Sequence, residues 1–156
     1  MTRRQGIMLS LFPAILLLWS AESFAQLVQL CEWPPKKAAV DFNVPVPGKI
    51  SGRFCEIRNG TPHDGVDIAG VEGTPVVAAA GGTVAKVLFD DRPGNHIVID
   101  HGNGVTTVYA HLKDERARVS EGAVVEKGQV IALRGSTGNS TGPHLHFSVK
   151  VDGKAV

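Results

Sequence analysis

From Lys49 onward, the sequence alternates between short runs rich in β-branched residues and breaks that carry Gly, Asn or Asp. Runs such as residues 73–87 and 124–136 contain segments of strand length, and "DHGNGV" at 100–105 has the composition of a hairpin turn. The only helical pattern is a weak one in "KDERARV" at 113–119. The sequence therefore predicts an all-β domain, a compact antiparallel sandwich or a barrel-like pair of sheets.

The first 25 residues have the layout of a secretory signal peptide. Arg3 and Arg4 precede an apolar run from Ile7 to Trp19, and the small residues Ser23 and Ala25 follow it. The run is shorter than the roughly 20 residues that span a bilayer, which disfavours the alternative of an uncleaved anchor. We expect cleavage after Ala25 and secretion across the inner membrane into the periplasm.

The rest of the chain is expected to divide into two parts. Residues 26–48 are rich in proline and lack periodicity, so we expect an extended lead-in over the surface of a domain at 49–156. After removal of residues 1–25, the numbers of acidic and basic side chains are equal, which disfavours nucleic acid as a partner. No later segment is apolar enough to predict stable membrane insertion after signal cleavage.

The two cysteines, Cys31 and Cys55, both lie in the part expected to be exported. An even cysteine count in an oxidising compartment favours a disulfide between them, and the alternative is a pair of free buried thiols.

Two histidines stand one residue apart in "GPHLHFSV", at the start of an expected strand. Because side chains at i and i+2 of a strand share a face, His144 and His146 should project side by side. Two neighbouring imidazoles need partners, and a shared metal ion is the usual reason for placing them together. The alternative is a pair of surface histidines.

A second candidate pair lies in "TPHDGVDIAG", where Gly65 between His63 and Asp67 would let the backbone bend. An imidazole and a carboxylate are both good zinc ligands, although this spacing alone also suits an ordinary polar loop. Asp64 is the competing carboxylate, but we expect it not to bind the ion itself and instead to face solvent or to contact the residues that bind the ion. Combined with one of the two neighbouring histidines, the pair offers two imidazoles and one carboxylate as three protein ligands, and catalytic zinc sites leave their fourth position to water. The other histidine of the two would then transfer protons or stabilise an oxyanion.

The other three histidines carry weaker signals. His111 ends the run "VYAHL", and if it reaches the same cleft it could contact the reacting groups, with Tyr109 as a neighbour on the same face. The alternative is a strand-end histidine in solvent. His96 and His101 stand at the two ends of one run, and we interpret both as structural.

Four blocks follow one another in the sequence: "HDGVDIA", "GTPVVAAAGGTV", "GNHIVIDHGNGVTTVYAHL" and "GQVIALRGSTGNSTGPHLHF". Together they resemble the lysostaphin/LytM-type zinc metallopeptidases, which cut peptide bonds in bacterial peptidoglycan. The resemblance covers roughly residues 49–152.

The resemblance implies roles for five residues. His63, Asp67 and His146 match the ligands of one zinc ion, whereas His111 and His144 match catalytic positions near the water that is activated there. Because every one of these residues is present, the resemblance implies an active endopeptidase. The division of acid and base roles between the two catalytic histidines stays open.

The sequence departs from the family pattern in two places, and it leaves other functions open. The chain ends at Val156, where family domains commonly continue, and Cys55 stands where a glycine is more usual.

Two functions other than an active endopeptidase stay open. One is a catalytically idle module that binds cell wall or activates an amidase, and the other is a carrier-type module suggested by "VVEKGQVIALRG". The signal peptide and the two neighbouring histidines disfavour the carrier. The expected substrate is a stem-peptide cross-link ending in D-alanine, with a glycine bridge as the alternative, and a regulatory partner is not identified.

Overall fold

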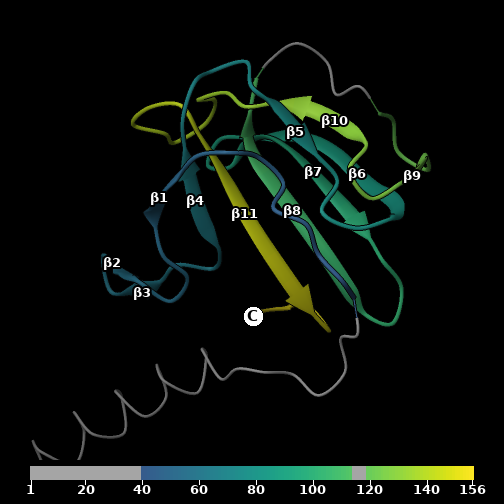
Figure 1. The fold of residues 1–156 in the computed structure, drawn as a ribbon. Coiled ribbons are helices and arrows are strands. Elements are labelled where there is room, and N and C mark those ends of the chain that lie inside the picture. The colour runs from purple at the N-terminus through teal and green to yellow at the C-terminus, as the bar shows by residue number, and fades with distance from the viewer. Residues whose placement is uncertain (1–39, 114–118) are drawn as a thin grey trace, which may run out of the picture. The chain divides into compact units, whose positions relative to one another are not determined.

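The computed structural model describes residues 40–113 and 119–156, which fall within one compact unit. These residues form strands and turns without any helix, and all the strand pairings are antiparallel (Figure 1). The all-β prediction is confirmed. The weak helical pattern at 113–119 falls largely outside the described residues. Within the described part there is consequently no helix long and apolar enough to cross a membrane.

The strands follow one another along the chain with short connections. They are β1 (Lys49–Gly52), β2 (Ile57–Arg58), β3 (Thr61–Pro62), β4 (Val66–Ala69), β5 (Pro75–Val77), β6 (Gly82–Asp90), β7 (Gly94–Asp100), β8 (Val105–Leu112), β9 (Val124–Val125), β10 (Val130–Leu133), β11 (His144–Val151) and β12 (Lys154–Ala155).

Eight of these strands form one sheet in the order β1-β4-β11-β8-β7-β6-β9, with β12 paired to β11 (Figure 1). Strands β5 and β10 form a separate pair, as do β2 and β3. Strands β6, β7 and β8 are consecutive, and the turn at 100–105 joins β7 to β8 as its composition predicted. Strand β11, from the end of the chain, lies between β8 and β4, which brings the two histidine-bearing motifs side by side.

The core lies between one face of the large sheet and the β5–β10 pair. Ile97, Ile99 and Tyr109 of the sheet belong to the same buried cluster as Val76 of β5 and Ile131 of β10. All five are buried to 1% exposure or less. Burial of such apolar surface is the main stabilising contribution in a domain of this kind, and it leaves the opposite face of the sheet free for polar residues.

The end of the expected lead-in is part of this core. Val46 is only 1% exposed, and Phe42 packs against the buried cluster. Asn43 N donates to Ala79 O at 2.8 Å, and Val77 N donates to Pro45 O at 2.8 Å. Residues 42–46 are thus integrated with the domain instead of merely crossing its surface. The division into 1–25, 26–48 and 49–156 stays a prediction, because residues 1–39 lie outside the described part.

Strand β8 contains a bulge that changes which residues face the core. Across β7, Ile97 lies opposite Tyr109 whereas Asn95 lies opposite Leu112, so β8 has one residue more than β7 in this interval. His111 within the bulge has a φ of 57°, in the left-handed region that few residues other than glycine adopt. As a result Tyr109 and Leu112 both belong to the core cluster.

The expectation that Tyr109 shares a face with His111 is therefore wrong. The Tyr109 hydroxyl accepts a hydrogen bond from Ala79 N at 2.8 Å and another from Thr107 Oγ1 at 3.1 Å, inside the core. Strict alternation along a strand would have placed positions 109 and 111 together, but the extra residue of the bulge breaks that alternation.

Candidate metal centre and active-site groove

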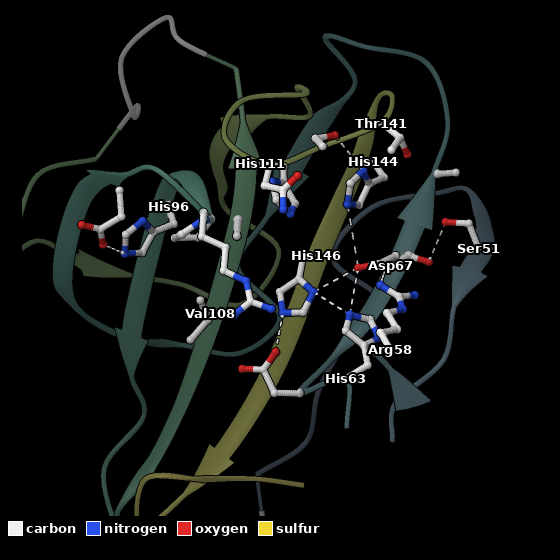
Figure 2. A pocket seen from close by; sticks show the side chains of 18 of the residues that line it. Ser51, Arg58, His63, Asp67, His96, Val108, His111, Thr141, His144 and His146 are labelled. Atoms are coloured by element: carbon white, nitrogen blue, oxygen red, sulfur yellow. Dashed lines mark hydrogen bonds and ion pairs between the residues drawn. The ribbon is translucent and has the colours of Figure 1, made fainter. Parts of the chain in front are cut away.

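Three side chains converge on the polar face of the large sheet, at the boundary between β4 and β11. His146 lies directly opposite Asp67 in the pairing of these strands, and His63 precedes β4 (Figure 2). His63 Nε2 lies 3.0 Å from His146 Nδ1 and 3.2 Å from Asp67 Oδ1, and His146 Nδ1 lies 3.0 Å from Asp67 Oδ1. The three residues expected to bind zinc thus present one potential ligand atom each to a common point.

The other nitrogen of each ring has an oxygen acceptor. His63 Nδ1 donates to the carbonyl of Arg53 at 2.9 Å, and His146 Nε2 lies 3.3 Å from Asp64 Oδ1. Such contacts select the tautomer that leaves a lone pair on the converging nitrogen, and they orient the ring. Asp64 therefore contacts a member of the cluster without joining the triangle, in agreement with the prediction for it.

This donor set fits a metal ion. A tetrahedral zinc site with bonds of about 2.0–2.1 Å separates neighbouring ligand atoms by about 3.3 Å. The separations of 3.0–3.2 Å in the triangle are close to that spacing. Two imidazoles with one carboxylate also form the kind of three-ligand set that catalytic zinc sites use. The residues at this position therefore suit a divalent transition metal.

The electrostatics of the cluster reflect the close contact of acids and bases. Burial lowers the pKa of His146, but hydrogen bonds with Asp64 and Asp67 outweigh it and raise that pKa to about 9. The hydrogen bond from His146 in turn lowers the pKa of Asp64 to about 2. Burial raises the pKa of Asp67, yet hydrogen bonds from His146 and Arg58 hold it well below its usual range. Without an ion, a proton on His146 balances these carboxylates.

Arg58 is a member of the site that the sequence analysis missed. Its Nη1 donates to Asp67 Oδ2 at 2.7 Å, and its Nη2 donates to Glu56 Oε2 at 2.9 Å. Asp67 thereby presents Oδ1 to the histidines while Oδ2 is held by the guanidinium. No pattern around Arg58 in the sequence indicates this contact, because it depends on how β2 folds beside β4.

His111 and His144 lie beside the triangle, with their ring centroids 4.5 Å apart. His111 Nδ1 donates to Thr137 O at 2.8 Å, and His144 Nδ1 donates to Gly142 O at 2.8 Å. Each neutral ring therefore keeps its lone pair on Nε2, and His144 Nε2 lies 3.9 Å from Asp67 Oδ1. Burial lowers the pKa of His111, which favours its neutral form.

The strained backbone of His111 is held on both sides by hydrogen bonds. Its N donates to Pro93 O at 2.8 Å, and its O accepts from Gly135 N at 3.1 Å. A non-glycine residue in the left-handed region costs about 1 kcal/mol or more, and such strain is common at functional sites. Here the strained conformation accompanies the bulge that brings His111 to the groove.

The two histidines interpreted as structural lie outside the triangle. His101 bonds to Gly81 O at 2.8 Å and to Thr107 Oγ1 at 2.7 Å, away from the groove. His96 bonds to Gly94 O at 3.1 Å and lies 3.6 Å from Asp90, and it also lines the groove (Figure 2). His96 is therefore placed where a molecule bound in the groove can contact it.

The structure gives reasons for two small-residue positions in the motifs. A Cβ at Gly65 would lie 2.4 Å from Phe147 O and 2.8 Å from His146 Cε1, so this glycine is needed for close approach. Cys55 has a φ of 59°, in the left-handed region that glycine adopts without strain. The proposed partner of Cys55, Cys31, lies outside the described residues, so the disulfide stays a prediction.

Comparisons with known proteins agree with this geometry. The chain matches Peptidase family M23 over residues 61–156. It is 43% identical over 95 residues to the peptidoglycan DD-endopeptidase ShyA of Vibrio cholerae, covering 61% of this chain and 22% of that protein. Curated relatives of this kind are far longer, and the chain spans about a fifth of their length.

Solved structures show the same fold. A zinc-containing peptidase from Vibrio cholerae superposes with a TM-score of 0.67 at 37% identity, over 74% of this chain and 38% of that one. The catalytic domain of lysostaphin from Staphylococcus simulans superposes with a TM-score of 0.59 at 30% identity, over 78% of this chain and 94% of that one. The expected lysostaphin/LytM resemblance is thus confirmed, and the chain belongs to Peptidase family M23.

Proposed function

We propose that this chain is a zinc-dependent endopeptidase that hydrolyses peptide cross-links of bacterial peptidoglycan. His63, Asp67 and His146 would hold one zinc ion, and His111 and His144 would act on the substrate. The observation that carries the proposal is the convergence of three potential ligand atoms at 3.0–3.2 Å, with two more imidazoles beside them.

Zinc bound there would polarise the peptide carbonyl and make water a stronger nucleophile at neutral pH. The chain's own contribution is proton transfer and charge stabilisation by His111 and His144. Because both Nδ1 atoms are bonded to carbonyls, each Nε2 is free to accept a proton when neutral, or to donate one to a developing oxyanion or leaving amine when protonated.

The substrate proposal rests on the relatives. ShyA is named as a peptidoglycan DD-endopeptidase, which favours the cross-link that ends in D-alanine. The alternative is a glycine bridge.

We also propose that the protein acts in the periplasm after removal of residues 1–25, and that Cys31 and Cys55 pair there. The layout of the N-terminal sequence supports export, and export supports an oxidised cysteine pair. Peptide mapping of the secreted protein, with and without reduction, would test both.

The decisive experiment incubates purified peptidoglycan with the zinc-loaded protein and identifies the released muropeptides by mass. We expect uncross-linked stem peptides, and we expect a chelator to stop their release. A protein that binds cell wall or activates an amidase without releasing any peptide fragment by itself would instead be the idle module considered as the alternative.

A further inference from the structure

The groove continues from the histidine cluster across the polar face of the sheet. It is lined by residues of four neighbouring strands: His146 of β11, Ala110 of β8, His96 of β7 and Leu88 of β6. Figure 2 shows His96 and Val108 on one side of His146, with His63 and Arg58 on the other. A peptide bound at the cluster therefore has a path over β8, β7 and β6.

The basic residues lining this groove fall into two groups. Arg58 and Lys150 lie close to carboxylates, with distances of 2.7 Å to Asp67 and 3.7 Å to Asp64. Lys86 and Arg92 also line the groove and are exposed, but neither forms an ion pair with another described residue. Two cationic side chains on the β6–β7 side are thus available to a ligand.

The backbone of Arg92 is held firmly beside the active site. Its carbonyl accepts a hydrogen bond from Asn139 N at 3.0 Å, and the next carbonyl, that of Pro93, accepts from His111 N at 2.8 Å. A Cβ at Gly138 would lie 2.7 Å from Arg92 O, so the two loops are in close contact. The guanidinium therefore projects from a fixed base next to a proposed catalytic histidine.

The remaining charges on this side do not cancel the two cations. Alternation along β6 puts Lys86, Leu88 and Asp90 on the groove face. Asp90 is the acidic residue among the lining residues here, and its carboxylate lies 3.6 Å from His96. Among the lining residues of this part, one carboxylate thus accompanies two cations, whereas the nearby carboxylates of Asp91 and Glu121 do not line the groove.

We propose that Arg92 and Lys86 form a subsite for side-chain carboxylates of the peptide substrate, so that the groove prefers an acidic stem peptide to a neutral one. The inference rests on the proposed function and narrows its substrate, because a glycine bridge carries no side-chain charge. Arg92 suits this role since a guanidinium binds a carboxylate through two parallel hydrogen bonds.

The test measures binding of two uncross-linked stem tetrapeptides to the zinc-loaded full chain by titration calorimetry. One peptide has free side-chain carboxylates, and in the other these groups are converted to amides. The wild-type protein should bind the acidic peptide about tenfold more tightly, the effect of one charge-assisted hydrogen-bonded contact. Arg92→Gln and Lys86→Gln should each reduce that preference, whereas Lys154→Gln, an exposed change outside the groove, should preserve it.

Equal affinities of the wild-type protein for the two peptides would overturn the inference. So would a preference that survives in the double variant carrying Arg92→Gln and Lys86→Gln. Cleavage of peptidoglycan is measured separately on the same preparations. A protein that binds the acidic peptide selectively but releases no muropeptide would refute the proposed activity and leave the subsite intact.

Discussion

Arg58 fixes the orientation of Asp67, because its Nη1 donates to Asp67 Oδ2 at 2.7 Å while Oδ1 faces His63 and His146. Partners of metal ligands typically contribute about 10- to 100-fold in affinity. We therefore expect Arg58→Gln to weaken zinc binding by about that factor, measured by competition with a chelator.

Glu56→Gln is the matched control for this prediction. Glu56 contacts the same guanidinium through Nη2 but does not touch Asp67. Its zinc affinity should stay within about threefold of the wild-type value, as expected for an exposed ion pair. An Arg58→Gln protein that retains zinc as well as Glu56→Gln does would show that the guanidinium has no positioning role.

Substitutions of the two histidines of β11 should affect metal binding and turnover differently. His146→Ala removes one corner of the triangle, so we expect loss of bound zinc and of peptidoglycan cleavage together. His144→Ala leaves the triangle complete, so zinc content should be retained while turnover falls about 100-fold or more, the usual contribution of proton transfer by a side chain. Elemental analysis and muropeptide release measure the two properties, and a His146→Ala protein with normal cleavage would refute the assignment.

The sequence predicted that His63, Asp67 and His146 would come together, and the structure shows their ligand atoms converging. Strand periodicity indicated that His144 and His146 share a face, and the family resemblance implied the roles of the remaining positions, which stay predictions. Arg58 was not predicted, because its contact with Asp67 joins strands β2 and β4, which belong to different sheets. Tyr109 was assigned to the wrong face because a bulge cannot be recognised from alternation alone. Both failures concern tertiary geometry, which local patterns in the sequence do not reveal.

Gly65 should be sensitive to the smallest substitution. An added Cβ would approach Phe147 O to 2.4 Å and His146 Cε1 to 2.8 Å, and backbone cannot yield as a flexible side chain does. We expect Gly65→Ala to destabilise the protein by about 1–3 kcal/mol and to displace the imidazole from the triangle. Thermal unfolding and zinc affinity measure these effects.

Gly81→Ala provides the control, because a Cβ there meets Val125 O at an ordinary 3.5 Å. Its unfolding midpoint should remain close to that of the wild type. If Gly65→Ala were equally stable and bound zinc normally, the close approach of β11 to this glycine would not limit the site.

The raised pKa of His146 predicts how the metal-free protein responds to pH. Its pKa is about 9 in the folded state against 6.5 in the unfolded chain, so its stabilising contribution is complete below pH 6.5 and is lost as pH rises through 9. This difference corresponds to on the order of 3 kcal/mol. The lowered pKa of Asp67 acts in the opposite range, and its contribution is lost only in acid.

The stabilisation by zinc should increase as pH rises, because a bound ion requires the deprotonated nitrogen of His146 and its binding releases a proton at neutral pH. Between pH 6.5 and 9 we expect the unfolding midpoint of the metal-free protein to fall by roughly 10 °C, while the gap between zinc-loaded and metal-free protein widens. Metal-free His146→Ala should show no such decline, since the titrating imidazole is gone. A wild-type midpoint that stays level over this range, or a zinc effect that shrinks as pH rises, would mean that the proton on His146 does not compete with the ion.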